Sequence, residues 1–322
     1  MSLLEVENLS SHLLTRRGTV KAVDGVSLRV EAGETLGLVG ESGSGKSMTC
    51  LSIARLLPWP VGRAVGGKII FDGKDLMEAS EKEMSRMRGK ELAMIPQDPF
   101  SSLNPVFSIG NQLMEPLRIH LGMSGKPLQE RARELLSLVR IPEAGRRLNQ
   151  YPHQLSGGMR QRVVGAMAAS CRPKLVLADE PTTSLDVTTQ AQFLYLLKSI
   201  QSEFGMGMIY VSHDLGVVAR VSDRVAVMYA GKIVEQASAK DIFERPAHPY
   251  TRALLDSIAP VDRDVERLPS IDGDPPELYD IPVGCRFANR CPHVMPKCRE
   301  LAPPPAKIGK DHVADCWLHY AD

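Results

Sequence analysis

The sequence lacks a long apolar run, a basic N-terminus followed by an apolar stretch, and an excess of either charge. No apolar run reaches the roughly 18 residues of a membrane-spanning helix. The first residues, MSLLEVENLS, show no pattern of a secretory signal. Lys and Arg total 39 against 38 Asp and Glu, which argues against the basic surface of a nucleic-acid-binding protein. We therefore expect a cytosolic protein that meets a membrane only through partner chains.

One stretch that the sequence does contain is G-x-x-x-x-G-K-S. It follows an apolar run, Thr35–Val39, and precedes a helix-like stretch, Met48–Leu57. A phosphate-binding loop needs this context, because the loop N–H groups and the positive helix end face one anion. We predict a nucleoside triphosphate site, with Lys46 on the β- and γ-phosphates and Ser47 on Mg²⁺. A glycine turn that merely contains a lysine is the alternative. The predicted binding residues are Gly40, Glu41, Ser42, Gly43, Ser44, Gly45, Lys46 and Ser47.

A second apolar run, ending in LVLADEP, predicts a buried parallel strand. It delivers Asp179 and Glu180 at its C-terminal end, where open α/β sheets place their ligands. Asp179 can hold Mg²⁺, and Glu180 can orient and polarise an attacking water. The alternative is an acidic pair on the surface. Another buried strand ends at His213, and a lone histidine is more often structural than functional.

The segment LSGGMRQR predicts the start of a helix. A serine and two glycines at a helix N-terminus predict a second anion site; these residues are Ser156, Gly157 and Gly158. The apolar residues that follow are expected to form a core stripe on one face, made of Met159, Val163, Val164, Met167 and Cys171.

The remaining pattern predicts an α/β core with two additions. Residues 3–39 alternate between apolar and polar, which predicts a small antiparallel β layer, and residues 66–73 predict a further hairpin. Helical spacing from about residue 100 to 170 predicts an insertion between two core strands. From about residue 245, prolines and charges predict a loop-rich appendage with one helix, Tyr250–Ile258. This appendage has too little periodic apolar content for a core of its own, so another device must stabilise it.

The motifs GESGSGKS, Gln97, LSGGMRQR, LVLADEP, Ser184-Leu185-Asp186 and His213 occur in one order along the chain. In that order and rough spacing they resemble the ATP-binding cassette of ABC transporters. The resemblance covers residues 1 to about 250. It implies a P-loop α/β fold with a RecA-like core, an antiparallel β layer and a helical subdomain at about 100–170. Residues 251–322 would form a small, cysteine-containing extension.

The resemblance also implies ATP and Mg²⁺ as ligands and hydrolysis of ATP to ADP and phosphate as the activity. Two cassettes of this family dimerise head to tail, so Ser156, Gly157 and Gly158 would serve the site across the dimer, with Asp186 at the seam. Gln97 would sense Mg²⁺ and the attacking water, and His213 would contact the γ-phosphate. The implied catalytic residues are Glu180, His213, Gln97 and Lys46, and the implied Mg²⁺ ligands are Ser47, Gln97 and Asp179.

Beyond the cassette, segments 246–255, 284–287 and 290–292 resemble oligopeptide and dipeptide importer ATPase subunits. Such subunits pair with a second, homologous ATPase under two membrane permeases. An extracytoplasmic binding protein delivers the substrate to these permeases. The resemblance therefore places the chain at the cytoplasmic face of the cell inner membrane. The helical insertion, including residues 100–116, would receive the permeases. Nickel, opine, glutathione or sugar oligomers remain alternative cargoes, since other chains choose the cargo.

Two other classes of protein fit the sequence less well. A soluble ABC ATPase that acts on DNA or ribosomes has long coiled coils or two tandem cassettes, and this chain shows one cassette and no heptad run. A sensor module in which ATP merely gates a metal-binding tail does not need Glu180 and LSGG, both of which are present.

Four of the six cysteines crowd the last 38 residues, with the spacing C-x5-C-x6-C-x17-C. In a reducing compartment this crowding suggests metal more than disulfides. Common zinc pairs are closer together, and ferredoxin spacings differ as well, so the pattern itself predicts only a soft metal centre. The importer resemblance implies a [4Fe-4S] cluster, while zinc and free thiols stay open. The four residues are Cys285, Cys291, Cys298 and Cys316.

One feature departs from the family pattern. Cassettes usually stack adenine on an aromatic residue shortly before the second strand. Between Leu9 and Ser27 this chain has no Tyr, Phe or Trp. Arg16, Arg17 or His12 are candidates to stack instead.

Overall fold

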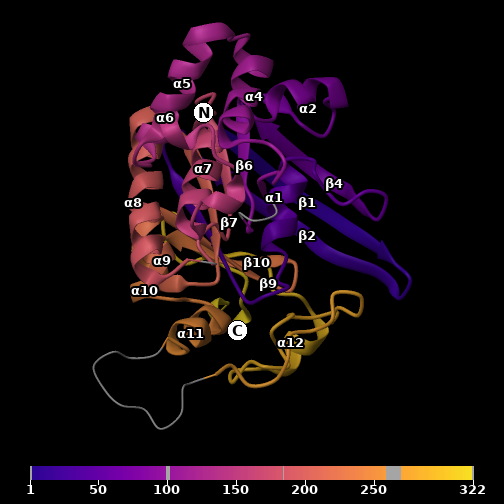
Figure 1. Ribbon diagram of the computed structural model, residues 1–322. Helices are drawn as coiled ribbons and strands as arrows, with labels where there is room; N and C mark the ends of the chain where they lie inside the picture. The colour runs from indigo at the N-terminus through magenta and orange to yellow at the C-terminus, as the bar shows by residue number, and fades with distance from the viewer. Residues whose placement is uncertain (1, 99–101, 184, 259–269, 321–322) are drawn as a thin grey trace. The chain divides into compact units, whose positions relative to one another are not determined.

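The computed structural model describes residues 2–98, 102–183, 185–258 and 270–320 (Figure 1). The chain divides into two compact units. The first unit comprises Met1–Leu3, Val30–Glu34 and Leu76–Val211, and the second comprises Leu4–Arg29, Thr35–Asp75 and Ser212–Asp322. Phe100 and Ser184, which carried parts of the predicted insertion and of the Ser-Leu-Asp motif, lie outside the described residues.

The first unit is built on parallel strands. They are β6 (Leu92–Ile95), β7 (Leu175–Asp179) and β8 (Gly207–Ser212, whose last residue falls in the second unit). Leu92 pairs with Leu175, and Asp179 pairs with Val211. All five residues of β7 are buried, as expected for a strand covered on both faces. The residues that follow β6 and β7 therefore emerge at one edge of these strands.

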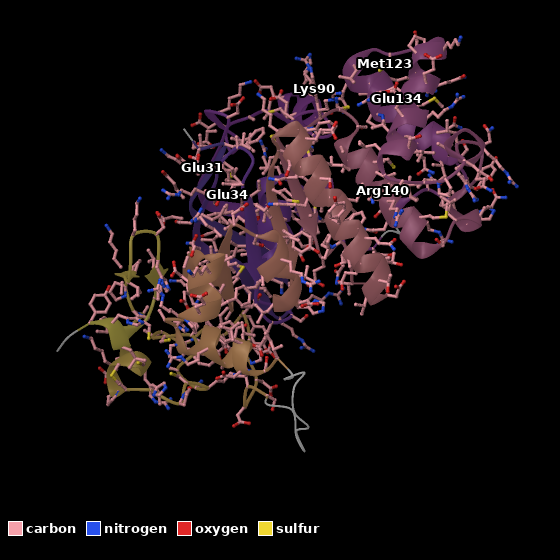
Figure 2. The ribbon with its side chains drawn as sticks, turned by 90° about the vertical axis from the view of Figure 1, so that its left-hand side faces the viewer. Glu31, Glu34, Lys90, Met123, Glu134 and Arg140 are labelled. Atoms are coloured by element: carbon pink, nitrogen blue, oxygen red, sulfur yellow. The ribbon has the colours of Figure 1, made fainter. Side chains whose placement is uncertain are left out.

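Helices occupy most of the chain between β6 and β7. The described helices of the first unit are α2 (Glu81–Met87), α4 (Ile109–Leu121), α5 (Gly125–Leu138), α6 (Ala144–Arg147), η1 (Pro152–Gln154), α7 (Gly157–Ala169) and α8 (Val187–Phe204). Figure 2 shows Met123 in the turn between α4 and α5, and Glu134 on α5. One face of α5 is buried, with Leu128, Ala132, Leu135 and Leu136 at helical spacing. The prediction for α7 was wrong in part, because its buried residues lie around the helix and Cys171 follows its end.

The second unit contains the predicted antiparallel layer, with strand order β2-β1-β4-β5. Its strands are β1 (Leu4–Thr15), β2 (Gly18–Val30), β4 (Gly62–Phe71) and β5 (Lys74–Asp75). The predicted hairpin lies at β4–β5, but its turn is Asp72-Gly73, where both residues adopt positive φ. Gly66 and Gly67 lie inside β4, opposite a register shift in β1.

The same unit contains a second set of strands. β3 (Thr35–Val39) runs parallel to β9 (Arg224–Tyr229), which is antiparallel to β10 (Lys232–Ser238). The tail then adds β12 (Val313–Ala314) and β11 (Ala306–Lys307) to β10. The helices are α1 (Lys46–Ile53), α9 (Leu215–Val221), α10 (Ala239–Glu244), α11 (Pro249–Asp256), α12 (Pro296–Glu300) and η2 (Trp317–His319).

The tail shares the core of the second unit. Phe287 is 1% exposed and its ring lies 5.3 Å from that of Tyr229 and 5.4 Å from that of Tyr250. Glu235, also buried, accepts hydrogen bonds from two backbone amides and lies 2.7 Å from His312. The expectation of an appendage with one helix and a separate stabilising device was therefore incomplete. Prolines break the local periodicity, yet aromatic packing and strand addition bury the segment.

Among the helices that the structure describes, none combines the length and the apolar character needed to span a lipid bilayer.

Candidate nucleotide-binding site

The phosphate loop of the second unit depends on two glycines. A Cβ atom on Gly40 would lie 2.0 Å from the carbonyl oxygen of Met228, and one on Gly45 would lie 2.2 Å from that of Ala22. Both glycines also have positive φ, a conformation that disfavours other residues. Any side chain at either position would force the backbone apart, so the loop shape requires glycine at both ends.

Lys46 lies inside this loop and is 4% exposed. Its Nζ donates hydrogen bonds to the carbonyl oxygens of Gly40, at 2.8 Å, and Glu41, at 2.9 Å. Ser44 Oγ is buried and has no hydrogen-bond partner within the described residues. A buried ammonium beside an unsatisfied hydroxyl, at the N-terminus of α1, is an arrangement suited to an anion such as a phosphate.

The tail holds the phosphate loop through Glu41. The Arg290 guanidinium binds both carboxylate oxygens of Glu41, at 2.6 and 3.0 Å. It also donates to the carbonyl oxygens of Ile271 and Asp272. The Glu41 amide donates to the Tyr250 hydroxyl at 2.9 Å. Hydrogen bonding to Glu41 raises the pKa of Arg290 above its usual range. In the sequence, Arg290 stands only within a family motif, and no local pattern indicates Glu41 as its partner.

The predicted carboxylates lie in the first unit, at the end of β7. Asp179 is 5% exposed. Glu180 has a positive φ of 44°, and its amide donates to the carbonyl oxygen of Val211 at 3.1 Å. Its Oε2 accepts from Gln97 Nε2 at 3.2 Å and from Thr183 Oγ1 at 3.0 Å. The structure thus brings Gln97 and Glu180 together, in keeping with the shared site that the family resemblance implies. A role for Thr183 was not predicted from the sequence, although this residue lies only two positions after the LVLADEP motif.

The glycine signature also lies in the first unit, at the start of α7. Ser156 caps this helix and accepts a hydrogen bond from the Met159 amide at 3.3 Å. A Cβ on Gly158 would lie 2.5 Å from Thr189 Cγ2, so glycine is needed there for packing. Asp186 caps α8 and accepts from the Thr189 amide at 2.9 Å. Asp186 thus has a structural role within the unit.

His213 is exposed and belongs to the second unit, directly after β8. The next residue, Asp214, caps α9. The predicted site residues are thus divided between the units: Gly40–Ser47 and His213 in the second, and Gln97, Asp179, Glu180 and the signature in the first.

The four tail cysteines are free thiols that influence one another electrostatically. Burial, and then the neighbouring Cys298, Cys316 and Cys291, raise the pKa of Cys285 to about 11. The Cys285 amide also donates to the Cys298 carbonyl oxygen at 2.7 Å. The sequence therefore predicted their proximity. In the part of the chain that the structure describes, however, no three or more His, Cys, Asp or Glu side chains are arranged to hold a metal ion. The described residues of the tail therefore do not form the predicted ligand group.

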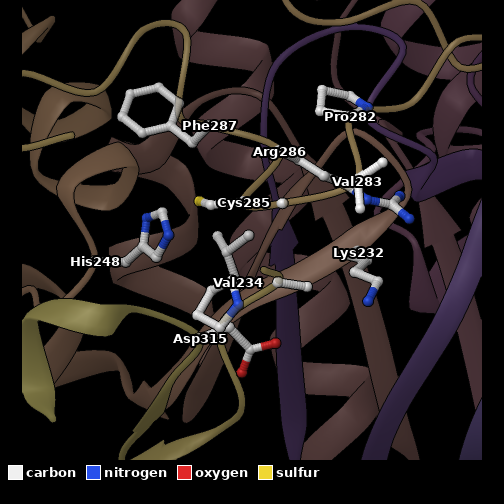
Figure 3. A pocket seen from close by; sticks show the side chains of 12 residues that line it. Lys232, Val234, His248, Pro282, Val283, Cys285, Arg286, Phe287 and Asp315 are labelled. Carbon is white, nitrogen blue, oxygen red and sulfur yellow. The ribbon is translucent and has the colours of Figure 1, made fainter. Parts of the chain in front are cut away.

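A small cavity of about 80 Å³ lies beside Cys285 (Figure 3). Its wall includes His248 and Asp315. Burial lowers the pKa of His248 to about 3 and raises the pKa of Asp315 to about 6. Both effects disfavour charge, so His248 is neutral near neutral pH, whereas Asp315 becomes protonated only below about pH 6. His248 Nδ1 accepts from the Tyr250 amide at 3.0 Å, which gives the imidazole a structural role.

Two family models match the chain. One, described as "ABC transporter", matches residues 23–183. The other, described as "Oligopeptide/dipeptide transporter, C-terminal region", matches residues 234–298. The first range contains most of the cassette motifs, and the second contains the segments after residue 245 that resemble importer subunits.

Relatives match over nearly the whole chain. The dipeptide transport ATP-binding protein DppD of Bacillus subtilis (strain 168) is 50% identical over 315 residues, which cover 98% of this chain and 94% of that protein. The oligopeptide transport ATP-binding protein OppD of the same organism is 50% identical over 321 residues, covering 99% and 90%. Among solved structures, the dimeric, post-hydrolysis ATP-binding cassette MJ0796 bound to ADP and phosphate has a TM-score of 0.66. It is 27% identical and covers 73% of this chain and 98% of its own.

The Glu41–Arg290 pair generates a prediction about the phosphate loop. Replacing Arg290 with Met leaves the Glu41 carboxylate without its cation. We expect the free energy of unfolding to fall by about 2–3 kcal/mol, less than the 3–5 kcal/mol typical of fully buried pairs, because Glu41 remains 28% exposed. Denaturant titration of Arg290→Met, Glu41→Gln and the double variant measures the coupling.

Arg29→Met is the matched control. Arg29 pairs with Asp311, and both side chains are about half exposed, so its loss should change stability by less than about 1 kcal/mol. Additive effects of the Glu41 and Arg290 changes would show that the two side chains are not coupled.

Proposed function

The chain belongs to the ABC transporter family, in its oligopeptide/dipeptide group, and from this membership we propose that it hydrolyses ATP to drive peptide uptake. The observation that carries the proposal is the buried Lys46 ammonium inside a loop that glycine alone can form. Peptide cargo is supported by the match of residues 234–298 and by the printed functions of the relatives. Nickel, opine, glutathione or sugar-oligomer cargo would leave the ATPase chemistry unchanged.

In the proposed reaction, Lys46 and the loop amides neutralise the phosphates. Glu180 accepts a proton from a water whose oxygen attacks the γ-phosphorus, and the bond to the β-phosphate oxygen breaks, releasing ADP and phosphate. Gln97 and Thr183 orient the Glu180 carboxylate through their hydrogen bonds. We propose that His213 contacts the γ-phosphate.

Mg²⁺ fits the available donors, because hydroxyl, amide and carboxylate oxygens are the ligands that it prefers. Ser47, Gln97 and Asp179 would hold it, and when bound it would neutralise charge on the β- and γ-phosphate oxygens. Asp179 is the last residue of β7, and the carboxyl ends of strands in open α/β sheets are where ligands bind.

We further propose that the chain works as one half of a heterodimer with a second, homologous ATPase subunit. Ser156, Gly157 and Gly158 would serve the ATP held by that subunit, and Asp186 would lie near the seam. Two permeases and an extracytoplasmic binding protein would complete the importer, with this chain at the cytoplasmic face of the inner membrane. The proposal assigns no nucleic-acid partner. It is supported by the family membership and by the start of α7, which Ser156 caps.

For the tail we propose that Cys285, Cys291, Cys298 and Cys316 hold a [4Fe-4S] cluster with a structural or redox-sensing role. The support is the presence of four free thiols in the tail, with the Cys285 amide hydrogen-bonded to the Cys298 carbonyl oxygen at 2.7 Å. Cluster binding would have to draw the thiols into a ligand group that the described residues do not form. The raised pKa values of Cys285, Cys291 and Cys316 would have to fall on binding, because thiolates are the metal ligands. None of these cysteines belongs to a phosphate-contacting motif, so the cluster would take no part in hydrolysis.

The role of Glu180 predicts the behaviour of Glu180→Gln. The glutamine oxygen can still accept from Gln97 and Thr183, but it cannot take the proton. Steady-state ATP hydrolysis in the assembled transporter should fall by about 10²-fold or more, with ATP binding retained. Glu203→Gln, an exposed carboxylate on α8, is the control. Near wild-type turnover of Glu180→Gln would remove Glu180 from this role.

The assignment of the signature to the partner's ATP predicts the effect of Ser156→Arg. Nucleotide trapping resolved by subunit should show loss at the phosphate loop of the second ATPase, with retention on Lys46 of this chain. A helix N-terminus serves only the anion that it faces. Ser108→Arg, which removes the cap of α4 in the same unit, controls for the lost cap. Loss at this chain's own loop alone would reverse the assignment.

The cluster proposal predicts iron. Protein purified without oxygen should be brown and contain about four irons per chain, and Cys285→Ser should lose most of them. Cys171→Ser, outside the tail, should keep them. About one zinc per chain without visible absorbance would indicate a zinc site instead. Four thiols that alkylate freely in the folded protein, with no metal bound, would contradict the proposal.

A further inference from the structure

A cavity of about 760 Å³ lies beside the phosphate loop, within the second unit. Its volume is in the range of small-molecule sites, about 300–1,000 Å³. Ser42 and Gly43 of the loop form one part of its wall. The end of β1 and the start of β2 supply Thr15, Arg16, Arg17 and Val20. The rest comes from the tail, residues 274–279.

The position of this cavity suits the base of the nucleotide. With the triphosphate in the loop beside Lys46, the ribose and base must extend out of the loop. Ser42 and Gly43 line the cavity, so it offers a hollow of suitable volume next to the anion site. The sequence candidates Arg16 and Arg17 line it, whereas His12 is not among its lining residues.

Tyr279 is the aromatic residue among those that line this cavity. Its side chain is 47% exposed, which leaves part of the ring available to a ligand. The backbone beside it is fixed, because the Lys21 amide donates to the Leu278 carbonyl oxygen at 2.9 Å. An aromatic ring that is held by its backbone and about half exposed is a suitable stacking surface, and every base has a face that can stack on it.

The preceding tail segment is anchored as well. Arg290 binds the carbonyl oxygens of Ile271 and Asp272 and, with the same guanidinium, the Glu41 carboxylate of the phosphate loop. The segment that carries Tyr279 is thus held at one end by Arg290 and at the other by Lys21. Both attachments lead to elements that border the nucleotide site. The tail wall of the cavity is therefore preorganised relative to the loop.

We propose that this cavity is the base subsite and that Tyr279, a tail residue, supplies the aromatic surface that the chain lacks between Leu9 and Ser27. The proposal rests on the proposed function, since it needs ATP in the loop. Arg16 and Arg17 line the same cavity and complete its wall with cationic, planar groups that also pack on bases. The tail is then part of the nucleotide site and contributes to the choice of base.

The test compares ATP with inorganic tripolyphosphate, which has the phosphates but no base, on the full-length chain. Tyr279→Ala should weaken ATP binding by roughly 5- to 100-fold, the loss expected for a stacking surface. Its affinity for tripolyphosphate should stay within about twofold, a difference near the error of such measurements. Tyr279→Phe should bind ATP like the wild type. Tyr320→Ala is the matched control, because Tyr320 is a tail tyrosine, 36% exposed, that contacts Trp317 and is not among the residues lining the cavity.

A second measurement uses 8-azido-ATP and light on the wild type. Label on the peptide that contains residue 279, or on the one that contains residues 16 and 17, supports the proposal. Equal ATP affinity of wild type and Tyr279→Ala, or label confined to other peptides, overturns it. The proposal is also overturned if the wild type binds ATP no more tightly than tripolyphosphate. A wild type that binds neither ligand contradicts the proposed function itself, so the two failures are distinguishable.

Discussion

The nucleotide site depends on a backbone that closes around one buried ammonium. Gly40 and Gly45 lie so close to the carbonyl oxygens of Met228 and Ala22 that no side chain fits. Only with these contacts in place can Lys46 reach the carbonyl oxygens of Gly40 and Glu41 from inside the loop. A buried cation is costly unless it is hydrogen-bonded and meets an anion. The loop is thus arranged for a phosphate before any ligand arrives.

The tail extends this constraint. Its residues contribute the guanidinium that binds Glu41, the ring of Phe287 that packs on Tyr229 and Tyr250, and two short strands added to β10. A segment with so many prolines cannot form long regular elements, but it can bury single aromatic and charged groups in a neighbouring core. The tail is consequently a structural part of the second unit, and the phosphate loop shares its stability.

In the first unit, strand pairing and side-chain hydrogen bonds orient Glu180. Parallel pairing of β6 with β7 sends the residues after both strands to one edge, which is how Gln97, 83 positions away, reaches the Glu180 carboxylate. The positive φ of Glu180 turns the chain sharply at the end of β7. Strained positions of this kind occur often at functional sites, and here two side-chain hydrogen bonds compensate for part of that cost.

The sequence by itself determined the local features and their order. The glycine spacing predicted the loop, the apolar run predicted β7, and the serine before two glycines predicted the start of α7, because each depends on neighbours within a few residues. Tertiary structure alone decided the contacts between distant segments. Arg290 with Glu41, Thr183 with Glu180, and Tyr279 beside the loop leave no periodic or spacing signal. The same holds for the four cysteines, whose crowding predicted a soft metal centre, whereas the described residues form no metal-binding group. The physical reason is that contacts between distant residues depend on how the whole unit packs, and no short stretch of sequence encodes that packing.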